Sequence, residues 1–172
     1  MRFPLFIELE NRPCLVVGGG RVAARKAEAL AEFGARVVQV APEVSGRGFE
    51  DADVEGMALV VAATDDPKVN RRVADLCKEK GIPVNAVDDP GNCTFFFPAI
   101  ARRGPMTIAA SSGGACPVAA KLVRDKAAQF LSDDFVAEVE RLGESREQLK
   151  KDYPDPRERM KVCEEALAKW KD

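Results

Sequence analysis

The chain has 172 residues, of which 46% are hydrophobic and 31% charged, so it is long and apolar enough to bury a globular core. A net charge of −2 and a pI near 5.4 argue against general nucleic-acid binding, which usually needs a basic surface. No apolar run approaches the roughly 20 residues of a membrane span, and early acidic residues are unlike a signal peptide. We therefore expect a cytoplasmic protein with no nucleic-acid or membrane partner.

Cysteine and histidine usage narrows the chemistry. The five cysteines are scattered without metal-type spacing, so free thiols in a reducing compartment are expected. The chain has no histidine, which removes the commonest general base and a common metal ligand. Acid–base chemistry must therefore fall to carboxylates, thiols or the backbone, and no resident metal site is predicted.

Short apolar strands alternate with helices in the first half of the chain. We predict strands at 14–17, 36–41, 57–63 and 83–87, and helices at 21–33 and about 67–80, each helix ending before a glycine. This order is typical of a parallel sheet with right-handed crossovers, and predicts an α/β, Rossmann-like domain. Only residues 42–56 separate the second and third strands, so one sheet edge is expected to be shortened.

The second half has a different character. After Pro98 the sequence predicts a strand, a turn at 103–105, a second strand over about 106–111, and helices over 117–131, 133–150 and 156–171. Pro117 suits the first position of a helix. The predicted organisation is a Rossmann-like domain over residues 1–98, a small α+β region over 99–132 and a short helical C-terminal region over 133–172.

A glycine-rich loop, VVGGGRVAARK, joins the first strand to the first helix. Gly18 permits the tight turn and Gly20 lets the backbone approach a pyrophosphate. Backbone N–H groups from Gly19, Arg21 and Val22 at the helix start then bind the phosphates. The alternative is a tight turn without a ligand, but the strand–loop–helix setting favours dinucleotide binding.

The ends of the next two strands supply further cofactor candidates. Pro42 and Glu43 follow the second strand, where a carboxylate is expected to bind the ribose hydroxyls. This acid favours NAD over NADP, although Arg47 leaves the alternative open. Thr64 ends the third strand on the side where such folds bind ligands, whereas the two aspartates after it are interpreted as helix caps.

Asp88 and Asp89 follow the fourth strand, in the stretch PVNAVDDPGNCTFFFP. One interpretation is a turn, because Asp-Pro-Gly-Asn is ordinary turn chemistry. The other is that Asp88 accepts a proton beside a large flat ligand, with aromatic burial raising its pKa. Asp89, which precedes a proline, is predicted to be the turn former. The phenylalanines at 95–97 are predicted to alternate on a strand, mostly in the core or an interface.

These motifs together resemble a known family, the bifunctional precorrin-2 dehydrogenase/sirohydrochlorin ferrochelatase, which is the N-terminal module of siroheme synthase. The resemblance covers about residues 3–131 and rests on PLFIELENRPCLVVGGGRVAARKAEALAEFGARVVQVAPE, AATDDPKVNRRVAD and VNAVDDPGNCTFFFPAIARRGPMTIAASSGGACPVAAKLVRDK. It implies NAD-dependent oxidation of precorrin-2 to sirohydrochlorin, followed in many members by insertion of ferrous iron. A dehydrogenase-only member and a non-catalytic NAD-sensing module are the alternatives.

The resemblance also implies site residues and a partner. The family's N-x-x-D pattern falls on Asn85 and Asp88, which makes Asp88 the key acid–base residue and Asn85 a cofactor contact. A second glycine-rich loop, SSGG, suits the carboxylates of a tetrapyrrole, with Ser112, Gly113 and Arg103 as the candidate contacts. Helix capping alone is the other interpretation of this loop. Region 99–132 is expected to form a homodimer.

Overall fold

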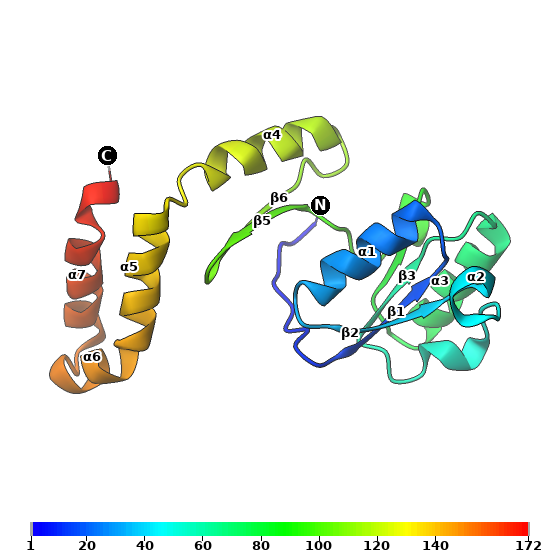
Figure 1. The fold of residues 1–172 in the computed structure, drawn as a ribbon, viewed down its shortest axis with the longest axis horizontal. Helices are drawn as coiled ribbons and strands as arrows, with labels where there is room; N and C mark the ends of the chain where they lie inside the picture. The colour runs from blue at the N-terminus through cyan, green and yellow to red at the C-terminus, as the bar shows by residue number, and fades with distance from the viewer. Residues whose placement is uncertain (1, 172) are drawn as a thin grey trace. The chain divides into compact units, whose positions relative to one another are not determined.

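The computed structural model describes residues 2–171 and divides them into two compact units, one from Phe3 to Phe97 and one beginning at Pro98 (Figure 1). The first unit contains β1 (Pro13–Val17), α1 (Arg21–Ala31), β2 (Arg36–Val40), α2 (Pro42–Ser45), the 3-10 helix η1 (Asp51–Val54), β3 (Leu59–Ala62), α3 (Pro67–Glu79), β4 (Val84–Ala86) and η2 (Pro90–Asn92). The second contains β5 (Ala99–Arg103), β6 (Met106–Ala110), α4 (Pro117–Ala128), α5 (Asp133–Glu144), α6 (Arg146–Asp152), α7 (Pro156–Ala166) and η3 (Ala168–Trp170).

The strands of the first unit form a parallel sheet in the order β2-β1-β3-β4. Alternate residues of β1 face opposite sides, so Leu15 and Val17 join a core with α3 while Cys14 and Val16 join a core with α1. The two helices therefore cover opposite faces of the sheet, as Figure 1 shows. The predicted α/β, Rossmann-like fold is confirmed.

The connection between β2 and β3 leaves β2 at a sheet edge. Residues 41–58, all of them described, fold into α2 and η1 and add no strand. The Arg47 guanidinium donates to the Asp53 carboxylate at 2.9 Å, and this hydrogen bond raises the pKa of Arg47 and lowers that of Asp53. Asp53 also accepts the Glu50 N–H at 2.8 Å, which closes the connection on itself. The predicted shortening of one sheet edge is confirmed.

The chain itself covers the opposite edge of the sheet. The Val84 N–H donates to the Thr94 hydroxyl at 2.7 Å, and the Val84 carbonyl accepts the Thr94 N–H at 2.8 Å. The first of these bonds uses the Thr94 side chain where a ladder would use backbone. Residues 95–97 form no strand, so the prediction of a strand there is wrong and the segment is irregular. Phe95 and Phe97 still pack on the α1 core, with ring centroids 5.3 Å apart.

The second unit is built around an antiparallel hairpin. Arg103 pairs with Met106 at its tip, and Ala99 pairs with Ala110 at its other end. Helix α4 packs against both strands, yet none of its residues is buried. Leu131, Phe135 and Val136 form a separate small core that Met106 and Ile108 join from the hairpin. This arrangement matches the predicted α+β region followed by a helical C-terminus.

The helical C-terminal region is interrupted at one point. The Ser145 hydroxyl donates to the Arg141 carbonyl at 2.7 Å, so α5 ends there and α6 begins as a separate helix. The region over 133–150 is helical as predicted, apart from a break at Ser145, where the Arg141 carbonyl accepts both the hydroxyl and the N–H of this serine, the N–H at 3.0 Å. Within residues 2–171, none of the helices has both the length and the apolar character needed to cross a membrane.

Candidate functional site: the carboxyl edge of the parallel sheet

The glycine-rich loop is held by both strands beside β1. Gly18 has φ +130°, and a Cβ there would lie 2.2 Å from the Ala63 carbonyl oxygen. Its N–H donates to the Val40 carbonyl at 2.9 Å, and its carbonyl accepts the Gln39 side-chain amide at 2.8 Å. Glycine is therefore required where the ends of β1 and β3 approach, and the turn is fixed before any ligand binds.

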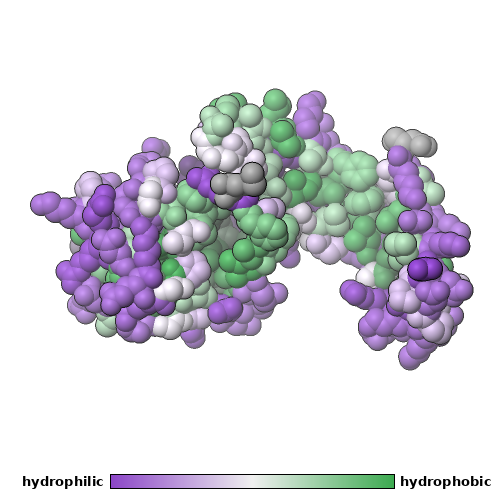
Figure 2. Space-filling view, turned by 180° about the vertical axis from the view of Figure 1, so that it is seen from behind, coloured by the Kyte–Doolittle hydropathy of each residue, from purple (hydrophilic) through white to green (hydrophobic). Residues whose placement is uncertain are grey.

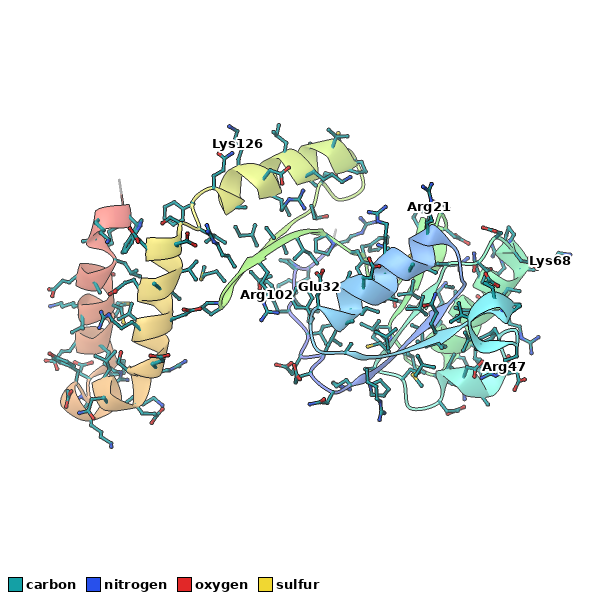
Figure 3. All side chains as sticks on the ribbon, in the orientation of Figure 1. Arg21, Glu32, Arg47, Lys68, Arg102 and Lys126 are labelled. Atoms are coloured by element: carbon teal, nitrogen blue, oxygen red, sulfur yellow. The ribbon has the colours of Figure 1, made fainter. Side chains whose placement is uncertain are left out.

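The start of α1 offers backbone donors to a ligand. Gly20 is the N-cap and has no side chain to accept from the first turn, and the space where its Cβ would stand is open to 4 Å. Arg21 and Val22 are exposed, and Figure 3 shows Arg21 at this N-terminal end of α1. First-turn N–H groups at the positive end of a helix dipole bind anions, phosphate above all.

A cavity of about 310 Å³ lies beside this loop. Six of the predicted cofactor residues line it together: Gly18, Gly19, Gly20, Pro42, Glu43 and Thr64. They come from the ends of three neighbouring strands, where an open α/β sheet binds its ligands. Phe49 and Val69, which the sequence did not single out, add apolar walls.

Glu43 lies against the glycine loop. Its carboxylate Oε1 would be 2.1 Å from a Cβ at Gly19, so the absence of a side chain at Gly19 makes room for this acid. Arg47, whose role the sequence left open, is instead paired with Asp53 and lies on the connection to β3 (Figure 3). The polar group presented to the cavity at the end of β2 is thus a carboxylate.

Thr64 is fixed by a residue that sequence reasoning missed. Asn70, on the first turns of α3, accepts the Thr64 N–H at 3.0 Å and donates to the Thr64 carbonyl at 2.9 Å. The available signal was a polar residue opening the buried stripe of the helix, at positions 70, 73, 74 and 77. Asp66 caps the same helix by accepting the Lys68 N–H at 2.8 Å, as interpreted from the sequence.

Asp88 and Asp89 occupy one tight turn after β4 but in different states. The Asp89 N–H donates to the Ala86 carbonyl at 3.3 Å, and Asp88 sits in the left-handed region at φ +59°. The Asp89 carboxylate accepts the Asn92 amide at 2.7 Å and lies 3.6 Å from Arg71. The Asp88 carboxylate, in contrast, has no hydrogen bond or ion pair within residues 2–171.

Two details of this turn differ from the sequence expectation. Asp88 is exposed, so the expected burial beside the phenylalanines is wrong: Phe95 and Phe97 turn toward the α1 core instead. Asn85 is buried and lies outside the cavity lining, because its amide donates to the Phe95 carbonyl at 3.0 Å and reaches Cys93 Sγ at 3.5 Å. In this structure the Asn85 side chain holds the segment around Phe95, which follows the turn.

The three candidate substrate contacts, Ser112, Gly113 and Arg103, lie in the second unit but not at one site. Ser112 and Gly113 follow β6, and the Ser112 hydroxyl accepts the Cys116 N–H at 2.9 Å. Arg103 lies at the opposite end of the hairpin, about 15–20 Å away at the rise of a strand. There its guanidinium donates to the Leu131 carbonyl and pairs with Asp133. The hairpin register thus separates Arg103 from the SSGG loop.

Comparisons with known proteins agree with this geometry. A family model described as "Putative NAD(P)-binding" matches residues 5–99, which is more than half of the chain. A structure titled "SirC, precorrin-2 dehydrogenase" has the same fold, with a TM-score of 0.73 over 96% of this chain and 89% of that chain at 22% identity.

Relatives with closer sequences are siroheme synthases. The chain is 41% identical to one from Ectopseudomonas mendocina (strain ymp), over 95% of this chain, and 46% identical to one from Thioalkalivibrio sulfidiphilus (strain HL-EbGR7), over 75%. It spans 38% and 29% of the length of these curated relatives. The resemblance expected from the sequence is confirmed.

Proposed function

We propose, from the premise that this chain belongs to the family of NAD(P)-binding domains, that it catalyses the NAD-dependent oxidation of precorrin-2 to sirohydrochlorin. The observation that carries the proposal is the placement of a glycine-rich, anion-binding loop and an exposed carboxylate, Asp88, at the same edge of one sheet. The siroheme synthase relatives and the precorrin-2 dehydrogenase neighbour support the choice of substrate.

The residues of the cavity fit a dinucleotide. Open space at Gly20 and the first-turn N–H groups of α1 suit a pyrophosphate, and the Glu43 carboxylate suits the ribose hydroxyls. Glu43 would repel a 2′-phosphate, and Arg47 is held by Asp53, which together support NAD over NADP. Bound NAD supplies the acceptor for the hydride that the oxidation releases.

Asp88 supplies the base in this proposal. Oxidation of precorrin-2 releases one hydride and one proton, and the proton needs an acceptor in a chain without histidine. The Asp88 carboxylate follows β4 at the carboxyl edge of the sheet, and no hydrogen bond or ion pair from residues 2–171 engages it. In metal insertion the same carboxylate would accept protons that leave the pyrrole nitrogens. We keep ferrochelation as an extension of the proposal, with a dehydrogenase-only enzyme as the alternative.

The SSGG loop is the proposed contact for substrate carboxylates. Gly113 and Gly114 have φ +68° and +97°, and the position of a Cβ is open to 4 Å at Gly113 and lies 3.5 Å from the Arg2 guanidinium at Gly114. The Gly113 N–H donates to Ser111 Oγ at 3.2 Å in the free protein, so a bound carboxylate would have to compete with this hydroxyl. Backbone N–H groups in such a turn, placed before the first turn of α4, suit anionic groups. Ser112 and Gly113 remain our candidates, and Arg103 is the weakest because Leu131 and Asp133 already occupy its guanidinium.

The decisive test compares two conservative variants within one turn. Asp88→Asn removes the base but keeps a residue that tolerates φ +59°, and it should reduce NADH formation from precorrin-2 by about a hundredfold or more. Asp89→Asn keeps the oxygen that Asn92 contacts and should have a much smaller effect. Anaerobic absorbance spectra with NAD, with NADP, and with or without ferrous iron would report both steps.

Three results would change the proposal. Equal loss in the two variants would show that Asp88 is only a turn residue. Equal turnover with NADP would show that Glu43 does not select the cofactor. NAD binding without any NADH formation in the wild type would leave the non-catalytic sensing module as the better description.

We also propose that the chain works as a homodimer in the cytoplasm. Val118, Leu122 and Val123 are 73%, 60% and 59% exposed on α4, a helix without a buried residue, and Figure 2 shows uncovered apolar side chains over it. Val118 and Leu122 are four residues apart and share one helical face, with Val123 beside it, and a second copy would cover this apolar surface. None of the five cysteines, each among the described residues, forms a disulfide, which suits a reducing compartment.

Leu122→Asp tests the dimer by placing a charge at the centre of that face. Sedimentation equilibrium should show a shift from dimer to monomer at micromolar concentration. Met160→Asp is the matched control, because Met160 is 58% exposed on α7 and its substitution should leave the mass unchanged. A monomeric wild type would remove the homodimer from the proposal.

A further inference from the structure

The turn that carries Asp88 is tied together by a side chain that the sequence analysis assigned no role. Cys93 Sγ lies 3.1 Å from the Ala86 carbonyl oxygen and 3.3 Å from the Asp89 carbonyl oxygen, which are the first and last residues of the turn. Its single thiol proton is therefore shared between both ends of the turn. Asn85 approaches the same sulfur from β4 at 3.5 Å.

The turn needs such support because of Asp88. A non-glycine residue at φ +59° lies in the left-handed region, a strained conformation that persists where surrounding contacts hold it. Within residues 2–171 the Asp88 side chain makes no hydrogen bond that would help to hold it there. The contacts that fix the turn come instead from Asp89, Asn92 and Cys93.

We propose that Cys93 is a positioning residue for Asp88: its thiol joins the carbonyls of Ala86 and Asp89 and thereby keeps the Asp88 carboxylate aimed away from the protein. This inference rests on the proposed role of Asp88 as the base. It assigns no chemistry to the sulfur, which contacts backbone and an amide.

The test uses a deletion, a rescue and a matched control. Cys93→Ala removes the thiol but leaves the backbone bonds from Asp89 to Ala86 and from Asn92 to Asp89, so the variant should fold. Cys93→Ser keeps a donor at the same place. Cys163→Ala, on α7, removes a thiol from the other unit.

Two readouts separate positioning from general damage. Hydrogen exchange at the Asp89 amide should become about tenfold faster in Cys93→Ala, with partial recovery in Cys93→Ser and no change at the buried Val60 amide. The kcat for NADH formation should fall by about tenfold while the KM for NAD stays unchanged. Cys163→Ala should match the wild type in both measurements.

Exchange and kcat must change together for the inference to stand. Unchanged exchange, or faster exchange with unchanged kcat, would overturn it. If the wild type itself forms no NADH, the proposed function fails, and exchange at Asp89 alone still decides whether Cys93 holds the turn.

Discussion

Two glycine-rich loops of this chain lead into helices, but different forces shape them. The loop at 18–20 is held by neighbouring strands through Gly18, and the helix after it buries Ala23 and Leu30. The loop at 111–114 is closed by its own hydroxyls: Ser111 Oγ accepts the Gly113 N–H at 3.2 Å, and Ser112 Oγ accepts the Cys116 N–H. The helix that follows buries none of its residues.

The comparison shows when such a loop is ready to bind. Tertiary contacts fix the first loop in the free protein, so a ligand does not need to order it. Local serine bonds fix the second loop, while the covering of its helix is left to whatever packs on α4. We expect cofactor affinity to depend on the first loop alone, and substrate affinity to depend also on assembly.

The largest predicted difference concerns the two loop glycines with positive φ. Gly18→Ala would place a methyl group 2.2 Å from a backbone oxygen, so it should reduce the free energy of unfolding by about 3 kcal/mol or more. Gly113→Ala, at φ +68° with nothing within 4 Å, should cost only about 1 kcal/mol. Urea unfolding followed by circular dichroism measures both, and equal losses would break the comparison.

A smaller effect is expected on ligand binding at the first loop. Gly20→Asp places a carboxylate in the open space beside the α1 N-terminus, so NAD affinity should fall at least tenfold, or about 1.4 kcal/mol. Gly113→Ala serves as the control and should leave NAD affinity unchanged. Calorimetry on both folded variants gives the answer, and retained affinity in Gly20→Asp would remove this loop from the site.

The smallest predicted effect is a pH-dependent change in stability near the first loop. The hydrogen bond from Arg47 lowers the pKa of Asp53 in the folded protein. The pair therefore stabilises the connection between β2 and β3 at pH values above the ordinary carboxyl pKa of about 4, and this contribution is lost as the pH falls through the lowered pKa. Asp53→Asn should therefore be less stable than the wild type at pH 7, with a difference that shrinks below about pH 4. Thermal unfolding across pH tests this, and a constant difference would contradict it.

Much of the fold was predictable because local signals agreed with it. Short apolar runs predicted the strands, and Gly34 and Gly81 marked the ends of the first two long helices, all to within a few residues. The glycine-rich loop predicted the position of the cofactor cavity. Contacts that depend on register were not predictable. Gln39 reaches Gly18 only because β2 pairs with β1 at that position, and the hairpin register carries Arg103 away from Ser112.

The same limit applies to the Asp88 turn. The proline after Asp89 distinguishes it from Asp88 in sequence, but the contacts that engage the Asp89 carboxylate come from Asn92 and Arg71, which meet it only after folding. The exposure of Asp88 likewise follows from phenylalanines that turn toward α1, a choice that the run of three aromatic residues does not reveal.

The bonds between Val84 and Thr94 have a consequence for self-association. They occupy backbone groups of the edge strand β4, so this side of the sheet offers little template for another strand. The other edge of the sheet is β2, where Arg36 places a charge at the beginning of the exposed strand. The irregular segment after Asp88 thus protects the sheet from polymerising at the very edge where its proposed base stands.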